Sequence, residues 1–556
     1  MKVMKVSDLV EMLAKLEGKS YSLYRKLRNA TIIYRNFKLK LTKIQGDPHA
    51  EPSIVEVLIP NGSHRFSSKF FEEKNITPFI DYISRSLHII CRKYSERCGS
   101  GNSCYIGIPK PGPWILRRSS VEVGENRTLI LRFYVGLPAR GRRILGNEAA
   151  NIFHRKISNI VKDIMLLREK SDEIMDHIMN YLDQEYLRSW IKSKGYMFFI
   201  GNGSILPRES SISQKPLKNA VRFVSPKTLS VKVKLPSNRV IEGLAIPKGV
   251  LIITGGGYHG KTTLLKAIQE GIYNHIRGDG RELVVSREKT VTVKAEDGRI
   301  IHHVNISSFI RKLPSGELTE DFSSLNASGS TSMAASIIEA LEAGVELILF
   351  DEDSSATNLL YKDEAMVKII SEEPIVPLVN LLRSIVKKTG VGMVGVISAS
   401  SIPLYVADHI ILMEKYVPYD ITEYVKKNLS SKQLATLDFK PSQPRVFAGI
   451  CGFRKAKARG FKITITYSDG GKFELSIKDN PRIVEKGQVK TIAYVINYLC
   501  RKRIKKSVPE LVKHINDVLS KGFSALAKSV PPDLTMVNGL DVIWVLNRVL
   551  NAVFTK

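Results

Sequence analysis

Residues 251–263 read Leu251-Ile-Ile-Thr-Gly-Gly-Gly-Tyr-His-Gly-Lys-Thr-Thr263 and join an apolar run to a cluster of glycines. Gly255, four further residues and then Gly260, Lys261 and Thr262 have the spacing of a P-loop, a phosphate-binding turn between a strand and a helix. The apolar run before the glycines predicts the strand, and the run after Thr263 predicts the helix. A glycine-rich turn with a chance lysine is the alternative, and the presence of both flanking elements disfavours it.

The residue types in this stretch suit a chain of phosphates. Glycines let backbone amides turn inward around an anion, and the new helix adds its positive N-terminal end. We expect Lys261 to reach the β- and γ-phosphates of a nucleotide and to assist catalysis there, and Thr262 to place its hydroxyl on Mg²⁺. The predicted nucleotide contacts are Gly255, Gly256, Gly257, Tyr258, His259, Gly260, Lys261, Thr262 and Thr263.

Length and composition bound the class of protein. A chain of 556 residues predicts about three domains, and 43% hydrophobic residues suit a globular protein. No run of about 18 apolar residues is present, and the first residues lack the apolar core of a signal peptide, so we expect no membrane partner. Five scattered cysteines, without further ligands at zinc spacing, favour a reduced, cytoplasmic protein without structural zinc.

The net charge of +30 is unevenly distributed along the chain. Residues 246–430 hold 19 Lys and Arg against 23 Asp and Glu, whereas residues 431–556 hold 23 against 9. The segment with the P-loop is therefore mildly acidic, and the basic excess belongs to the segments on either side of it. This division favours a polyanionic partner such as nucleic acid. A basic composition kept for solubility is the alternative.

Two further segments supply what a P-loop site needs. The run Glu346-Leu-Ile-Leu-Phe-Asp351-Glu352 predicts a buried strand that ends in two acids. We expect Asp351 to hold Mg²⁺ through water, and Glu352 to polarise the attacking water as the catalytic base. Upstream, Ser328 and Gly329 precede a predicted helix, and a Ser-Gly turn at a helix start offers a hydroxyl and free amides to an anion.

These motifs together resemble the family of predicted ATPases of the ABC class. The segments that carry the resemblance are Tyr258-His-Gly-Lys261, Tyr273 to Glu282, Ala327-Ser-Gly-Ser-Thr-Ser332, Asp351-Glu-Asp-Ser-Ser-Ala-Thr-Asn358, Gln45-Gly-Asp-Pro48 and Gly136-Leu-Pro-Ala-Arg-Gly-Arg-Arg-Ile-Leu-Gly146. The resemblance implies ATP and Mg²⁺ as cofactors. It also implies a head-to-tail homodimer, formed with ATP, in which Ser328 and Gly329 complete the nucleotide site of the other copy.

The resemblance also implies a three-part α/β architecture. An ABC-type P-loop core is expected between a mixed α/β N-terminal domain and a small, basic α+β C-terminal domain. We place these domains at residues 1–215, 216–430 and 431–556, because a hairpin leads into the P-loop strand and Pro441-Ser-Gln-Pro444 is typical of a linker.

Two positions need separate treatment within this family pattern. ABC ATPases usually carry a His after the strand that follows the catalytic Glu, whereas here that place reads Gly395-Val-Ile-Ser398-Ala-Ser400. A hydrogen bond from Ser398 or Ser400 would be weaker, so we expect slow hydrolysis. For the aromatic residue that usually stacks on adenine we name Phe223, with an ordinary core residue as the alternative.

Two basic clusters lie in the flanking segments. One occupies a glycine-punctuated loop, whose flexible backbone and arginines suit phosphate contact, and the other precedes an alternating strand. We expect both to bind the nucleic-acid backbone, with RNA favoured over DNA because no DNA-reading motif is visible. A solvated charge run is the alternative for each residue. The predicted contacts are Arg140, Arg142, Arg143, Arg454, Lys455, Lys457 and Arg459.

The sequence as a whole predicts a soluble ATPase that couples ATP binding and slow hydrolysis to nucleic-acid binding. An ATP-gated nucleic-acid or protein scaffold with negligible hydrolysis is the alternative, and the missing His motivates it. The energising subunit of a transporter is a third hypothesis. The large basic additions on both sides of the core disfavour it.

Overall fold

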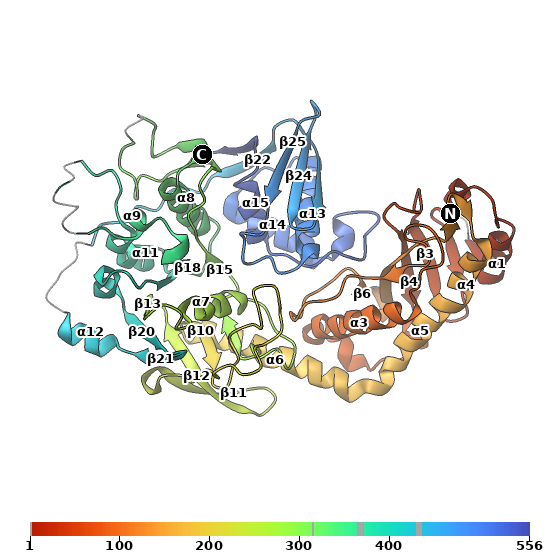
Figure 1. The fold of residues 1–556 in the computed structure, drawn as a ribbon, viewed down its shortest axis with the longest axis horizontal. Helices are drawn as coiled ribbons and strands as arrows, with labels where there is room; N and C mark the ends of the chain where they lie inside the picture. Colours follow the sequence, from red (N-terminus) through yellow and green to blue (C-terminus); the bar gives the residue numbers. More distant parts are fainter. Residues whose placement is uncertain (1–2, 314–315, 364–368, 370–371, 430–435) are drawn as a thin grey trace. The chain divides into compact units, whose positions relative to one another are not determined.

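The computed structural model describes residues 3–313, 316–363, 369, 372–429 and 436–556. The chain forms two compact units, Met1–Leu182 with Val518–Met536, and Asp183–Asp517 with Val537–Lys556 (Figure 1). The boundaries expected near residues 215 and 430 both fall inside the second unit. The segment 518–536, which we assigned to the C-terminal domain, clusters with the N-terminal residues.

The first unit is built on a seven-stranded sheet in the order β1-β2-β3-β4-β7-β5, with β6 also paired to β7. Alternation along β3 buries Leu39 and Leu41, while Lys38 and Lys40 lie on the other face. The strands are β1 Val3–Lys5, β2 Thr31–Ile33, β3 Lys38–Lys43, β4 Ser53–Ile59, β5 Ile106–Gly107, β6 Val121–Val123 and β7 Leu129–Val135, with a small hairpin of β8 Ala139–Arg140 and β9 Arg143–Ile144.

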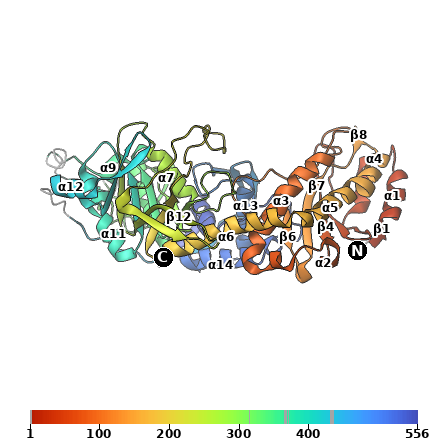
Figure 2. The same cartoon turned by 90° about the horizontal axis from the view of Figure 1, so that it is seen from below.

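The helices of this unit are α1 Val6–Ala14, α2 Asn61–His64, α3 Glu73–Tyr94, α4 Gly146–Asn151, α5 Ile157–Leu166 and α6 Ser171–Ser193, which continues into the second unit. Helix α3 packs against β5 and β6, and α1 packs against β1 and β2, while α5 packs on α3 (Figure 2). Between α1 and β2, Tyr21–Leu27 forms a 3₁₀ segment.

Residues 518–536 join the first unit through backbone hydrogen bonds. The amide of Ser119 donates to the carbonyl of Leu534 at 3.0 Å, and its hydroxyl donates to the carbonyl of Pro531 at 2.6 Å. The amide of Met536 donates to the carbonyl of Arg117 at 2.9 Å. These bonds fix a segment more than 400 residues away in sequence onto the N-terminal sheet.

A disulfide between Cys98 and Cys104 closes a loop in the first unit, with the two Cα atoms 5.7 Å apart. The prediction that all cysteines are reduced is therefore wrong for this pair. The closed loop supports the β8–β9 hairpin. The Ser100 amide donates to the Ala139 carbonyl at 2.8 Å, and the Ser100 hydroxyl accepts from the Gly141 amide at 2.8 Å.

The second unit is built on a six-stranded sheet in the order β15-β18-β19-β13-β20-β21 (Figure 1). Every neighbouring pair is parallel except β20 with β21. Its inner strands are continuously apolar because both faces are covered. The strands are β13 Val250–Thr254, β15 Thr290–Thr292, β18 Leu347–Asp351, β19 Gly392–Val396, β20 His409–Glu414 and β21 Val417–Asp420.

Smaller elements surround this sheet. An antiparallel sheet in the order β11-β12-β10-β14 contains the hairpin predicted across residues 236–239. The elements are β10 Tyr196–Gly201, β11 Ser230–Lys234, β12 Val240–Pro247, β14 Val284–Ser286, the pair β16 Arg299–Val304 and β17 Phe322–Ala327, and helices α7 Lys261–Glu270, α8 Gly329–Glu342, α9 Thr357–Leu360, α11 Leu382–Thr389 and α12 Thr422–Asn428.

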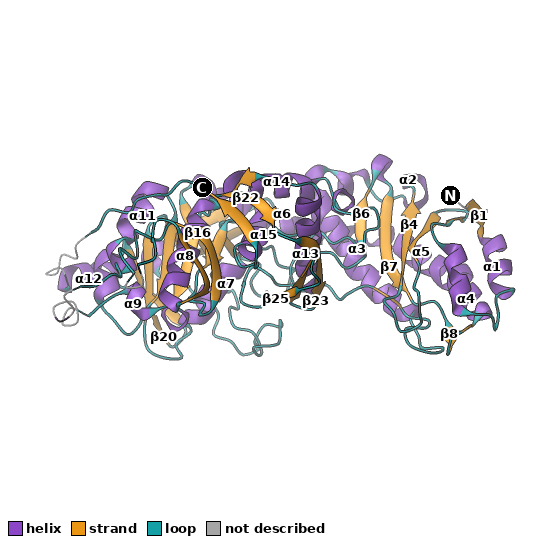
Figure 3. Cartoon of the chain, turned by 90° about the horizontal axis from the view of Figure 1, so that it is seen from above, coloured by secondary structure: helices purple, strands orange, loops and turns teal. Residues whose placement is uncertain are grey.

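The C-terminal part of the second unit has two three-stranded sheets, β26-β22-β27 and β23-β24-β25, and α13 packs on β23 and β24 (Figure 3). The elements are β22 Val446–Ile450, β23 Phe453–Arg459, β24 Lys462–Tyr467, β25 Lys472–Ser476, β26 Lys506–Ser507, β27 Ala552–Thr555, and helices α13 Lys486–Arg501, α14 Val508–Ser520 and α15 Gly539–Leu546. Across the described part of the chain, no helix combines the length and apolar character needed to cross a bilayer.

Two buried arginines, each with an acidic partner, fix this C-terminal part to the core of the second unit. Arg482 donates to the fully buried carboxylate of Asp541 at 2.6 Å, and to the carbonyl of Thr290 at the start of β15 at 2.7 Å. Arg445 donates to Glu342 of α8 at 2.7 Å. Because both partners of each pair are desolvated, losing one partner strands a buried charge.

Arg482→Leu is expected to lower the free energy of unfolding by about 3–5 kcal/mol, since Asp541 would stay buried without its cation. Urea unfolding of the full chain measures this change. Arg482→Leu combined with Asp541→Leu should recover most of the loss, because it removes both charges. A single variant as stable as the wild type would contradict this role of the pair.

Candidate nucleotide site

The P-loop lies where the sequence predicts it, between β13 and α7. Gly255 has a φ of +133°, and a Cβ built there would come within 2.3 Å of the Met413 carbonyl oxygen on β20. Gly260, directly before α7, has a φ of +93°. Both positions therefore require glycine, one for a close approach of two backbones and both for a left-handed backbone.

The side chains of the two residues after Gly260 are arranged as a phosphate and a metal ion would require. Lys261 Nζ donates to the carbonyls of Gly255 and Gly256, at 2.8 and 2.6 Å, so its ammonium group lies within the curve of the loop. Thr262 Oγ1 donates to Asp351 Oδ2 at 2.9 Å. A hydroxyl and a carboxylate in contact are the pair of oxygens that Mg²⁺ needs beside a triphosphate, so the residues present fit both ATP and Mg²⁺.

Asp351 ends β18 and is 7% exposed. Burial raises the pKa of its carboxyl group, and the hydrogen bond from Thr262 works against that rise. A bound cation would favour the charged form, because its positive charge compensates for the hydration that burial removes.

Glu352 follows directly and is held by three donors. Its Oε2 accepts from the amides of Ser398 at 2.8 Å and Ala399 at 3.1 Å, and its Oε1 accepts from the Tyr361 hydroxyl. Burial raises the pKa of Glu352, but these hydrogen bonds outweigh burial and leave it lowered. Glu352 is therefore a carboxylate of reduced basicity at the end of β18.

Ser328 and Gly329 open α8, as predicted, and Ser328 is exposed. The Ser328 side chain caps the helix by accepting from the Thr331 amide at 3.4 Å. Ser330 Oγ donates to Asn358 Oδ1 at 2.8 Å, which ties this turn to the loop after Glu352. The turn is thus exposed at the surface and is tied to the loop that follows Asp351 and Glu352 in the same chain.

Comparisons with known proteins support this arrangement. The P-loop domain model of the ABC ATPases matches residues 170–445, and the model described as the N-terminal part of ATPases of the ABC class matches residues 6–168. The chain belongs to the ATPases of the ABC class. An uncharacterized protein of Methanocaldococcus jannaschii is 33% identical over 223 residues, which are 38% of this chain and 48% of that relative. The chain thus aligns with about half of the relative's length.

Membership supports ATP binding at the P-loop of this ABC-class ATPase, and most predicted contacts converge there. Tyr258 is 98% exposed in the loop, and Gly256 and Gly257 are exposed beside it. His259 Nδ1 lies 3.2 Å from the Met413 carbonyl oxygen, and Thr263 lies in the first turn of α7.

Phe223 does not serve the role that we assigned to it. The ring is 2% exposed and belongs to the apolar core that includes Leu206 and Leu244. A ring enclosed by core side chains has no free face for adenine. Phe223 is thus an ordinary core residue, the alternative that the sequence left open.

Tyr361 and Ala399 are site residues that the sequence analysis missed. Both contact Glu352 directly, one through its hydroxyl and one through its backbone amide. Any residue type except proline can donate through its backbone amide, so the sequence gives no sign of the contact between Ala399 and Glu352. Only the position of the loop after β19 reveals it. Ser398 was named for its hydroxyl, but its contact with Glu352 comes from its amide.

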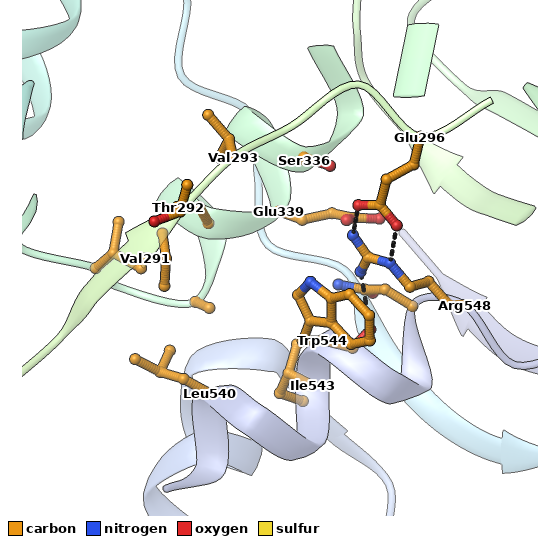
Figure 4. Close-up of a pocket in the computed structure, with 14 residues that line it drawn as sticks. Val291, Thr292, Val293, Glu296, Ser336, Glu339, Leu540, Ile543, Trp544 and Arg548 are labelled. Carbon is orange, nitrogen blue, oxygen red and sulfur yellow. Dashed lines mark hydrogen bonds and ion pairs between the residues drawn. The ribbon is translucent and has the colours of Figure 1, made fainter. Parts of the chain in front are cut away.

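A small pocket lies between α8 and the C-terminal helix α15 (Figure 4). Trp544 and Ile543 of α15 line it from one side, and Ser336 and Glu339 of α8 from the other. Arg548 stacks on Trp544, with its Cζ 3.8 Å from the ring centre, and pairs with Glu296. Its volume of about 50 Å³ has room for water rather than for a nucleotide.

The predicted nucleic-acid residues are exposed or half-buried at two places. Arg140, Arg142 and Arg143 are exposed on the β8–β9 hairpin of the first unit. The four C-terminal residues lie on β23 of the second unit, with Lys455 half-buried and the others exposed.

Proposed function

We propose that the chain hydrolyses ATP at a site that a second copy of the chain completes. ATP binding and hydrolysis in turn control the binding of nucleic acid, with RNA favoured over DNA, by the basic surfaces of the chain. One observation carries the proposal. Beside the P-loop, Thr262 contacts Asp351, and the next residue, Glu352, is held in place by the amide of Ser398.

The hydrolytic part follows from the roles of four side chains. Thr262 and Asp351 would hold the cation, which would supply positive charge against the phosphates. Lys261 leaves the loop carbonyls to pair with the phosphates, and Glu352 orients the attacking water and accepts its proton. Three donors on Glu352, and a Ser in place of the usual His, both favour slow turnover.

The dimeric part rests on where the two half-sites lie. The helix after the P-loop, α7, packs against β14 and β18, whereas α8 packs against β16 and α9. The Ser328 turn is exposed and offers the hydroxyl of Ser328 and the positive N-terminal end of α8. A second copy that presents this turn to the P-loop would enclose the triphosphate from both sides.

The nucleic-acid part rests first on one face of the β23-β24-β25 sheet. Lys455, Lys457 and Arg459 alternate along β23, and register places Arg459 opposite Lys462. Lys472 extends the same face on β25, which also carries one acid, Glu474. The opposite face is apolar and covered by α13, so the basic face is turned outward.

A contiguous set of contacts links this sheet to the nucleotide site. Ser332 in the first turns of α8 accepts from the Glu296 amide at 2.9 Å, and Glu296 pairs with Arg548, which follows α15. Helix α15 packs on α13, and α13 covers the basic sheet. A shift of α8 during closure would therefore reach the basic surface through packed elements.

The test is ATP hydrolysis with and without single-stranded RNA, double-stranded RNA and DNA across a salt series. We expect RNA to change the rate at low salt and the effect to fade steeply as salt rises. An unchanged rate with every nucleic acid would contradict the coupling.

An ATP-gated scaffold with negligible hydrolysis is the second candidate function. The donors that occupy both oxygens of Glu352 favour it, because a fully engaged carboxylate accepts a proton poorly. Closure with ATP but without phosphate release would support this candidate.

Tyr361→Phe tests the state of Glu352 through pH. A lowered pKa keeps Glu352 charged, and hydrolysis supported, to a pH below its ordinary range. Removing the Tyr361 donor raises that pKa, so the acidic limb of the single-turnover rate should move to higher pH. Tyr424→Phe, at an exposed tyrosine of α12, is the matched control and should leave the profile unchanged. An unmoved limb in Tyr361→Phe would contradict Glu352 as the base.

A further inference from the structure

Phe223 is buried in the core, so its ring is not free to contact the base of a nucleotide at the P-loop. The turn between β20 and β21 stands beside the P-loop and has two residues, Lys415 and Tyr416, since Glu414 pairs with Val417. Tyr416 is 56% exposed, so part of its ring is open to solvent.

The backbone of this turn is strained. Lys415 and Tyr416 have φ values of +48° and +70°, in the left-handed region that ordinary side chains avoid. Two-residue hairpin turns of this kind strongly favour Asn-Gly or Gly-Gly. A lysine and a tyrosine at these positions make the turn harder to form, and such strain concentrates where a side chain has a task.

Several contacts hold the turn against the P-loop. His259 Nδ1 lies 3.2 Å from the Met413 carbonyl oxygen and 3.4 Å from the Lys415 amide. A Cβ on Gly260 would lie 3.2 Å from Tyr416 Cδ1, so the edge of the ring adjoins the start of α7. The loop and the tyrosine are therefore positioned together.

The order of the strands gives the direction of a bound nucleotide. Asp351 and Glu352, which serve the γ-phosphate, follow β18, two strands from β13 on one side. Strand β20 adjoins β13 on the other side. A nucleotide whose γ-phosphate faces Asp351 extends across the P-loop in the opposite direction, toward the end of β20 and its turn.

We propose that Tyr416 stacks on the base of the nucleotide and is the aromatic contact that Phe223 does not provide. This inference rests on the proposed ATP site and adds the residue that contacts its base. A ring face contacts any base without reading its edges, so Tyr416 favours purines over pyrimidines by area and separates ATP from GTP little.

The test compares ATP with tripolyphosphate, which has no base, by calorimetry. The variant combines Lys415→Asn with Tyr416→Gly, which relieves the turn while removing the ring. We expect ATP affinity to fall by roughly 5- to 100-fold, the worth of one base–aromatic stack, while tripolyphosphate affinity stays unchanged. The melting temperature should hold or rise, whereas a merely structural role for Tyr416 would lower it.

Two further variants frame the result. Tyr416→Phe keeps the ring and should bind ATP like the wild type, and Tyr424→Gly on α12 should do the same. ATP affinity unchanged in the turn variant would overturn the inference while leaving the ATP site intact. Equal losses for ATP and tripolyphosphate would also overturn it, because they indicate a damaged P-loop. A wild-type protein that binds tripolyphosphate as tightly as ATP would overturn it as well, because the base would then add nothing to binding. A wild type that binds neither ligand overturns the nucleotide site itself.

Discussion

Glu352→Gln is expected to slow ATP hydrolysis by about 10²- to 10⁴-fold while leaving ATP affinity near the wild-type value. Gln keeps the length of the side chain and can still accept from the amides of Ser398 and Ala399, but it cannot accept a proton from water. Single-turnover release of phosphate from enzyme in excess over ATP measures the chemical step without product release. The effect falls on one step, because Lys261, Thr262 and Asp351 are untouched.

Asp353→Asn is the matched control for Glu352→Gln. Asp353 is the next acid in the chain and is exposed. The control removes the same charge two residues along the chain from Asp351, and it should retain most of the activity. Equal rates in the wild type and Glu352→Gln would contradict the assignment of the base and would favour the scaffold function.

Reversing the charge of Lys455, Lys457 and Arg459 together is expected to weaken RNA binding by roughly 10²-fold at low salt and to reduce the salt dependence. Each lost phosphate contact removes released counterions, so the slope of log affinity against log salt should become shallower by about two to three. Filter binding across a salt series measures both quantities. Basal ATP hydrolysis should not change, because these residues lie on β23.

The matched control changes net charge equally at a distant place. Lys232 and Lys234 are exposed on β11, and Lys427 is exposed on α12. Reversing these three residues to Glu should leave most of the RNA affinity, since they lie outside the basic face. Equal losses in the two triple variants would show that net charge alone attracts RNA, and would remove the β23 face from the account.

Local chemistry explains what could be predicted from the sequence. All residues of a P-loop lie within one short segment, here Gly255 to Thr262, so the motif can be recognised from the spacing of residues in the sequence. Asp351 and Glu352 end an apolar run, and Ser328 opens a helix, so each is marked by its neighbours. The P-loop fold was therefore predictable from the sequence.

Contacts between distant segments explain what could not be predicted. Nothing in the sequence places residues 518–536 on the N-terminal unit, because their bonds to Ser119 are mostly to backbone atoms. Phe223 is aromatic and upstream of the P-loop, but only packing reveals that its ring is enclosed. The Lys415-Tyr416 turn lacks the usual Asn-Gly signal, so its conformation is visible only in the structure.

The sequence showed which residues are basic, but it could not show which of them share one face of a sheet. The basic run at residues 454–459 was evident, but strand register decides that Lys455, Lys457 and Arg459 share a face with Lys462. Arg454 lies where the register of β23 shifts, outside that alternation. Side-chain direction depends on pairing, and pairing depends on segments apart in sequence.

Activity regained on mixing two inactive variants tests the central claim most directly. Lys261→Ala disables the P-loop but keeps the Ser328 turn, and Ser328→Arg disables the turn but keeps the P-loop. If the two half-sites come from different chains, a mixed dimer contains one intact site, and a 1:1 mixture should regain up to about a quarter of the wild-type hydrolysis rate. A mixture as inactive as either variant alone would contradict a nucleotide site shared between two copies.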